Sequence, residues 1–316
     1  MIKIGLNGFN RISKIIINNF FKNKKINLVV INLNNNNINI DNFIKILKYD
    51  TIYTKKKIFS IKKNKEEIKI NNKYKIKIIN EKNLKKVNWK KYKVKYIIET
   101  KKKIDPNIHI KQGASKVILT KKPKKKYPLL VIGENMDKIN KKNNIYYFSS
   151  IYINCLIPIL KILHREYKIL ECYGTFLEKS IIYRKKINNL IPFKNKIYKE
   201  IIQIIPDIKN LKFLNFLVPK INLSVLDLNL KFKKKTNYKK IKKIIKYNSK
   251  NEYSGILKYY NKTRYKKILY NKNICIFDSK LGFMINKNTV KIICRYNEIG
   301  YINKIIDIIL YIEKNI

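Results

Sequence analysis

Residues 5–13 read Gly-Leu-Asn-Gly-Phe-Asn-Arg-Ile-Ser and join a short apolar run, Ile2–Leu6, to a segment, Arg11–Phe21, with apolar residues at helical spacing. A second apolar run, Asn27–Ile31, follows shortly afterwards. A strand, a turn and a helix that returns to a second strand form the βαβ unit of a parallel sheet. The sequence therefore predicts a doubly wound α/β nucleotide-binding domain at the N-terminus.

The turn in this stretch carries a degenerate dinucleotide motif. The pattern G-x-G-x-x-G falls on Gly8, Asn10 and Ser13, so only its first glycine is literal. The middle position often needs a positive φ, which asparagine reaches more easily than most residues, and the last needs a small side chain. The acidic residue that binds the adenosine ribose is missing, because Asn32 and Leu33 stand at the end of the second strand. A plain tight turn is the alternative interpretation.

The pattern of apolar runs changes near residue 150. Before it, strands are predicted at Lys95–Glu99, Lys116–Thr120, Leu129–Gly133 and Ile145–Phe148, with hairpin strands at one sheet edge in the lysine-rich segments between Thr54 and Lys91. After it, we predict helices at Asn154–Tyr167, Tyr238–Lys246 and Ile302–Ile312, an antiparallel strand at Asn222–Phe232 and a β-stretch at Cys275–Asn286. The predicted organisation is a first domain over 1–150, an α+β domain over 151–300, and a C-terminal helix over 301–316 that returns to the first domain.

The chain is strongly basic. Its 316 residues hold 73 Lys+Arg and 20 Asp+Glu, a formal charge of 73 − 20 = +53. A nucleic-acid binder would concentrate its basic residues and favour arginine. Here lysine dominates from end to end, Ala114 is the only alanine, and Ile, Lys, Asn and Tyr, whose codons are rich in A and T, are abundant. We attribute the charge to an AT-rich genome and expect non-specific polyanion binding as its physical consequence.

Composition also argues against several classes of protein. The chain is 45% hydrophobic and 29% charged, and no apolar run approaches the length of a membrane-spanning helix. No secretory signal is evident at the N-terminus, so a cytoplasmic protein without membrane contact is expected. Four cysteines without a CxxC pair and two histidines predict neither a metal site nor a disulfide framework.

A series of blocks in matching order resembles the glyceraldehyde-3-phosphate dehydrogenase family. Gly5–Ser13 is similar to the family's NGFGRIG, Tyr96–Thr100 to YVVES, Ser150–Pro158 to SCTTNCLAP, Val218–Leu228 to VPTANVSVVDL, and Arg295–Asn303 to WYDNEFGYSN. The resemblance implies a Rossmann-type NAD-binding domain followed by the family's α+β catalytic domain. It also implies NAD-dependent glycolytic oxidation of a phosphorylated aldehyde, with phosphate, to an acyl phosphate by a homo-oligomer. NADP stays open as a cofactor because Leu33 is not acidic.

The family's catalytic groups are absent from the matching positions. The nucleophile position is Ile151 and the base position is Leu177, so neither side chain can carry the family's covalent chemistry. Cys155 matches a second cysteine of the family and is interpreted as core. His164 matches a non-catalytic histidine, and His109 is interpreted as part of an unrelated lysine-rich connection.

The resemblance assigns cofactor and phosphate positions to other residues. The cofactor-binding positions are Asn10, Arg11, Ile12, Lys82, Thr120 and Asn297, and the substrate or phosphate positions are Ser150, Tyr152 and Ser180. Three hypotheses stay open: a drifted dehydrogenase with a degenerate site, a non-catalytic relative that binds nucleotide or RNA through its basic surface, and a decaying gene product.

Overall fold

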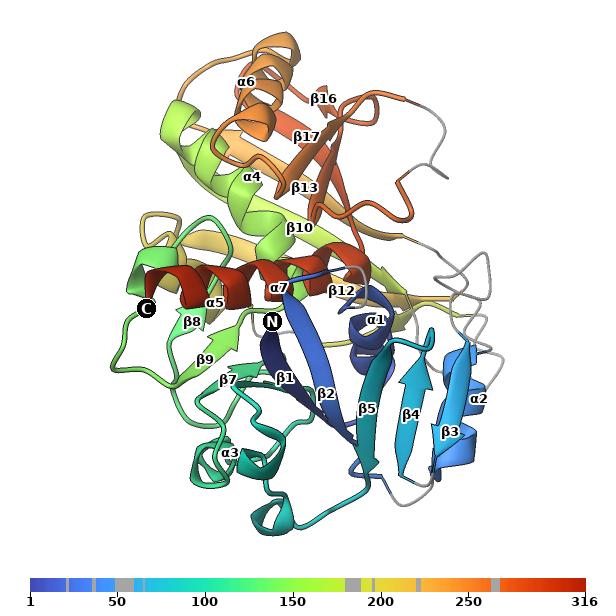
Figure 1. Cartoon of the computed structure of the whole chain (residues 1–316). Helices are drawn as coiled ribbons and strands as arrows, with labels where there is room; N and C mark the ends of the chain where they lie inside the picture. The colour runs from blue at the N-terminus through green and yellow to red at the C-terminus, as the bar shows by residue number, and fades with distance from the viewer. Residues whose placement is uncertain are drawn as a thin grey trace. The chain divides into compact units, whose positions relative to one another are not determined.

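Figure 1 shows the computed structural model of the chain, which describes residues 1–20, 23–35, 38–48, 60–64, 66–179, 189–194, 197–219, 223–262 and 268–316. These residues divide into two compact units. The first comprises Met1–Leu130, Asp137–Ser149 and Ile305–Ile316, and the second comprises Val131–Met136 and Ser150–Lys304.

The first unit is built on a sheet in which, among the described residues, nine strands follow the order β3-β4-β5-β2-β1-β6-β7-β9-β8. The strands are β1 (Ile2–Asn7), β2 (Ile26–Asn32), β3 (Ile61–Asn64), β4 (Glu67–Ile70), β5 (Tyr74–Ile79), β6 (Tyr96–Glu99), β7 (Lys116–Leu119), β8 (Leu129–Leu130) and β9 (Ile145–Phe148). From β5 to β8 every neighbouring pair is parallel, whereas β3, β4 and β5 are antiparallel and form the edge. Figure 1 shows β1, β2, β5, β4 and β3 side by side. The predicted parallel sheet with an edge hairpin is confirmed.

Short helices connect these strands. They are α1 (Arg11–Phe20), α2 (Ile40–Lys48), α3 (Asn107–Lys111) and the 3-10 turns η1 (Leu84–Lys86), η2 (Lys90–Tyr92) and, between β8 and β9 in the chain, η3 (Met136–Lys138). The central strands β6, β7 and β9 are buried along their whole length, as expected for a parallel sheet covered on both faces.

The second unit contains a sheet with, among the described residues, the order β11-β12-β10-β13-β17-β15-β14, and β16 pairs with β17. Its strands are β10 (Ile169–Lys179), β11 (Ile191–Pro192), β12 (Asn210–Val218), β13 (Ser224–Phe232), β14 (Leu257–Tyr260), β15 (Cys275–Asp278), β16 (Phe283–Met284) and β17 (Thr289–Tyr296), and its helices are α4 (Ile151–Tyr167), α5 (Tyr198–Ile204) and α6 (Tyr238–Lys250). β13 alternates buried and partly exposed residues, as its sequence predicts. The sheet is mixed, however, because β10 pairs with β12, and β14 with β15, in parallel.

Polar caps set the starts of two helices earlier than apolar periodicity indicates. α4 begins at Ile151 because Ser150 Oγ accepts a hydrogen bond from the Ile153 amide at 3.4 Å. α7 (Glu298–Asn315) begins where Asn297 Oδ1 accepts from the Gly300 amide at 2.7 Å. The last turns of α7, from residue 305 onward, belong to the first unit.

Candidate functional site

Two hydroxyl groups close the turn between β1 and α1. Ser13 Oγ donates to the Gly8 carbonyl at 2.7 Å, and Thr100 Oγ1 donates to the Asn7 carbonyl at 2.8 Å. Gly8 has φ +88°, and a Cβ there would lie 2.5 Å from Lys101 Cγ and 2.7 Å from Thr100 Oγ1. Only glycine fits this position. Serine suits the last motif position because it is small and its hydroxyl bonds within the turn.

Asn10 has a role that differs from the sequence expectation. It is not among the described residues with positive φ. Instead its side-chain oxygen accepts from the amides of Ile12 at 2.9 Å and Ser13 at 3.3 Å, while its amide group donates to the Thr100 carbonyl at 3.0 Å. Asn10 therefore caps α1 and ties the turn to the end of β6. The Ile12 amide, predicted to face the cofactor, donates to this cap.

The end of β2 carries no carboxylate among Asn32, Leu33 and Asn34. The Asn32 side-chain amide group donates to Asn7 Oδ1 and to the Glu81 carbonyl, each at 2.9 Å. Its hydrogen bonds are therefore made within the protein. The Leu33 side chain is buried. The chain thus lacks the acidic side chain that normally holds the adenosine ribose.

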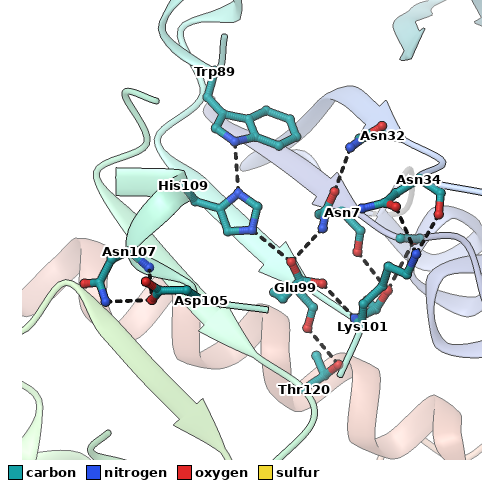
Figure 2. A network of polar contacts seen from close by, with 12 residues as sticks. Asn7, Asn32, Asn34, Trp89, Glu99, Lys101, Asp105, Asn107, His109 and Thr120 are labelled. Atoms are coloured by element: carbon teal, nitrogen blue, oxygen red, sulfur yellow. Dashed lines mark hydrogen bonds and ion pairs between the residues drawn. The ribbon is translucent and has the colours of Figure 1, made fainter. Parts of the chain in front are cut away.

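A buried network of hydrogen bonds around Glu99 supports the turn (Figure 2). The Glu99 carboxylate, at the end of β6, accepts from Asn7 Nδ2 at 2.6 Å, from His109 Nε2 at 2.8 Å and from the Lys101 amide at 2.7 Å. Its charge is therefore satisfied by three donors without contact with solvent. The network fixes Asn7, the last residue of β1 before the glycine turn.

The tautomer of the His109 imidazole follows from its contact with the Trp89 indole, whose N–H can only donate a hydrogen bond. Trp89 Nε1 donates to His109 Nδ1 at 3.0 Å, so the imidazole carries its proton on Nε2 and donates to Glu99. His109 lies in α3 and is fully buried. His109 thus lies in the connection between β6 and β7, where partners distant in the sequence give it a buried structural role that its sequence context did not predict.

The two positions predicted from the resemblance to be catalytic lie at the start of α4 and in β10. Ile151 and Leu177 are partly exposed and have no titratable atom. Tyr152 donates a hydrogen bond to Glu178 Oε2 and packs edge to face on Phe176, at 5.2 Å between ring centroids. Burial, and then Glu178, raise the pKa of Tyr152 far above its usual value. The tyrosine hydroxyl is thus neutral and committed to a neighbouring carboxylate.

All four thiols of the chain lie in buried surroundings. Cys155, Cys172, Cys275 and Cys294 are all free and buried. Burial raises the pKa of every one of these thiols, and Cys275 also exchanges hydrogen bonds with Cys155 and Cys294. Thiols in such surroundings are poor nucleophiles.

The other predicted site residues lie in different parts of the fold. Thr120 follows β7, is buried, and donates through Oγ1 to the Glu99 carbonyl at 3.0 Å. Lys82 is exposed after β5, and Arg11 begins α1. Asn297 belongs to the second unit, where Nδ2 donates to the Asn271 carbonyl at 3.3 Å. Ser180 lies outside the described residues.

The described ranges contain neither a cluster of metal ligands nor a membrane-spanning helix. In those ranges, no three or more His, Cys, Asp or Glu side chains are grouped to hold a metal ion. Over the same part of the chain, no helix is both long and apolar enough to cross a membrane.

A parallel sheet with a glycine turn between its first strand and helix, followed by a unit with a mixed sheet, defines a two-domain dinucleotide-binding α/β protein. The family model "Glyceraldehyde 3-phosphate dehydrogenase, NAD binding domain" matches residues 2–104, and the C-terminal domain of the same family matches residues 150–298. The chain belongs to the glyceraldehyde-3-phosphate dehydrogenase family.

Known proteins similar to the chain carry the same family name. Glyceraldehyde-3-phosphate dehydrogenase 2 of Agaricus bisporus is 28% identical, over 99% of this chain and 98% of its own length. The glyceraldehyde-3-phosphate dehydrogenases of Schizophyllum commune and Escherichia fergusonii are each 30% identical, over 99% of this chain and 98% and 99% of their own lengths. The similarity therefore extends through both domains.

Proposed function

We propose that the chain is a degenerate NAD-dependent oxidoreductase of the glyceraldehyde-3-phosphate dehydrogenase type. It retains the site for NAD and lacks the groups that convert a phosphorylated aldehyde to an acyl phosphate through a thioester. The observation that carries the proposal is the combination of an intact glycine turn with apolar side chains, Ile151 and Leu177, at the two catalytic positions.

The turn fits a dinucleotide. Gly8, at φ +88°, turns the chain sharply from β1 into α1, which starts three residues later at Arg11 with its positive dipole end toward the turn. In this proposal the Arg11 amide faces the pyrophosphate, Asn10 and Ile12 shape the turn through the helix cap, and Lys82 and Thr120 lie toward the two ends of the cofactor. Bound NAD would supply a hydride acceptor.

The substrate region is changed more deeply. The family's chemistry needs a thiolate that attacks the aldehyde and a base that accepts its proton. Ile151 and Leu177 supply neither, and Tyr152 directs its hydroxyl to Glu178. The Ser150 hydroxyl oxygen accepts the hydrogen bond that caps α4. Binding of a phosphorylated aldehyde at Ser150, Tyr152 and Ser180 would therefore not lead to an acyl-enzyme.

Cofactor binding is tested by thermal unfolding with and without NAD. A ligand at 100 times its Kd stabilises the folded state by about 2.7 kcal/mol. We expect a rise in Tm for the wild type and none for Gly8→Ala. Gly255→Ala is the matched control, because Gly255 has a similar φ of +74° but an added Cβ would have ordinary van der Waals contact, with Lys304 Nζ 3.9 Å away. Absence of any NAD effect on the wild type would refute cofactor binding.

Degeneracy is tested by a coupled NADH assay. We expect background rates from the wild type and from Cys155→Ser, and a gain of activity in the double variant Ile151→Cys, Leu177→His. Loss of one member of such a catalytic unit costs as much as about 10⁶ in turnover. Robust wild-type turnover that disappears in Cys155→Ser would show that a buried thiol has taken over the reaction.

A basic cavity in the first unit favours RNA binding as a second candidate function. It has a volume of about 1000 Å³ and is lined by Lys3, Lys24, Lys25, Lys93, Lys95 and Lys314 together with Tyr311. Two acidic residues, Asp307 and Glu313, also line it, and Glu313 forms an ion pair with Lys95. Lysines that follow a backbone beside an aromatic ring are typical of single-strand binding. Filter binding of a single-stranded RNA at low and high salt tests it, and no retention at low salt would refute it.

The same resemblance supports a homo-oligomer in the cytoplasm. Light scattering on the purified chain and fractionation of expressing cells would test these two points, and a strictly monomeric mass at high concentration would contradict the first.

A further inference from the structure

We propose that Lys101 receives the 2′-phosphate of a dinucleotide, so that this chain binds NADP at least as well as NAD. The inference rests on the proposed cofactor site. It adds a residue that determines which cofactor the site selects.

The topology places the relevant groups at one edge of the first sheet. β5, β2, β1 and β6 are parallel neighbours, so their carboxyl ends lie together. In this class of fold the pyrophosphate lies at the turn after the first strand, and the adenosine ribose lies at the end of the second. Here these two points are Gly8 and the segment Asn32–Asn34.

The Lys101 side chain spans these two points. Its Cγ lies where a Cβ on Gly8 would meet it, at 2.5 Å, so its stem crosses the glycine turn. Its ammonium donates to the Asn34 carbonyl at 2.6 Å and to Asn34 Oδ1 at 3.0 Å. Figure 2 shows this ammonium directed to both oxygens of Asn34. The positive charge is thereby held one residue beyond Leu33, the position of the missing acid.

The charges around this ammonium favour an anion. Among the described residues it forms no ion pair with a carboxylate. Glu99 directs its oxygens to Asn7, His109 and the Lys101 amide. Glu81, after β5, accepts from the Asn83 amide at 2.7 Å. An ammonium has three donors and Asn34 uses two, so one is left for a phosphate oxygen.

The selectivity then follows from two changes that act in the same direction. A carboxylate at the end of β2 would hold the ribose 2′-hydroxyl and repel a 2′-phosphate. Leu33 removes that repulsion, and Lys101 supplies attraction by a charge-assisted hydrogen bond. At the same edge the exposed Lys82 adds a positive charge, and the neighbouring Glu81, bonded through its backbone to Asn32, adds a negative one.

Calorimetric titration of the full chain tests the proposal with three ligands: NAD, NADP, and the isomer of NADP that carries a 3′-phosphate. The isomer has the charge of NADP, so it measures general attraction to a chain of charge +53. We expect NADP to bind the wild type most tightly.

Lys101→Met keeps the apolar stem and should weaken NADP binding by about 10- to 100-fold. It should leave NAD binding unchanged. Lys111→Met, at the exposed end of α3, is the matched control and should change neither.

The outcomes separate this inference from the proposed function. Equal binding of NADP and its 3′-phosphate isomer by the wild type, Lys101→Met and Lys111→Met would overturn the inference, because general charge attraction would then explain the binding. Tighter NAD binding in Lys101→Met would overturn it too, because the lysine would then obstruct the ribose position. If the wild type binds neither NAD nor NADP, the proposed cofactor site itself fails. Ligand-free unfolding of each variant shows that it is folded.

Discussion

At the residue scale, the buried histidine of the first unit makes the sharpest stability prediction. His109→Ala removes a donor from the Glu99 carboxylate and the acceptor of the Trp89 indole, both inside the core. Losing one hydrogen bond to a buried charged group costs about 1.5–3 kcal/mol, and leaving the buried indole N–H without an acceptor costs about 1–3 kcal/mol more. We therefore expect a loss of unfolding free energy of about 3 kcal/mol or more in urea denaturation. Lys111→Ala, on the exposed side of the same helix, should change it little, and a similarly small loss for His109→Ala would contradict the assigned network.

The same residue shows what a sequence cannot reveal at this scale. Gly8 and Ser13 could be assigned to the turn, because a motif of fixed spacing describes local geometry. The role of His109 depends on Trp89 and Glu99, which are brought to it by separate elements. The chain's one tryptophan and its scarcity of histidine were the available signals. Neither identifies a partner.

At the element scale, hydrophobic periodicity is sufficient to predict a helix or strand where the apolar residues continue regularly. Ile145–Phe148 is found within the bounds predicted for it, and α6 extends its predicted range only at the C-terminal end. α2 was not predicted, since it follows a run of asparagines that indicates a loop. α4 and α7 begin earlier than predicted because Ser150 and Asn297 cap them, and caps act through single hydrogen bonds outside any periodic pattern.

The junction between α4 and β10 should respond to pH. His164 Nδ1, in the last turn of α4, accepts from the Ile169 amide at 3.1 Å. Burial, and then Lys168, lower the pKa of His164, while Asp207 acts in the opposite direction. Below the ordinary histidine pKa of about 6.5 the unfolded chain takes up a proton that the folded chain resists, so stability falls on acidification.

The measurement compares the urea unfolding free energy of the wild type and His164→Asn at pH 7.5 and 5.5. Asparagine keeps an acceptor near the Ile169 amide and does not titrate. The wild type should lose more stability than the variant, by at most about 1.4 kcal/mol per pH unit for one group. Equal losses would show that His164 protonation is not linked to folding.

At the scale of the whole molecule, charge balance limits how well the surface can pair. With 73 basic and 20 acidic residues, one-to-one pairing leaves 73 − 20 = 53 basic groups unmatched. Surface pairs such as Lys63 with Asp41 contribute about 0–1 kcal/mol each, so they cannot offset repulsion spread over the chain. Self-repulsion of this kind destabilises the compact state.

Salt should therefore stabilise this protein. The Debye length falls from about 10 Å at 0.1 M to about 3 Å at 1 M, which screens the repulsion between separated lysines. We expect Tm to rise between these NaCl concentrations, by roughly 2–4 °C for each kcal/mol gained. A variant with Lys239, Lys243 and Lys250 of α6 changed to glutamine keeps helix propensity on an exposed face, so it should melt higher at 0.1 M and gain less from salt. If Tm falls with salt, or if the variant responds as the wild type does, the surface charge is not a significant destabilising force, and the lysine excess is thermodynamically neutral.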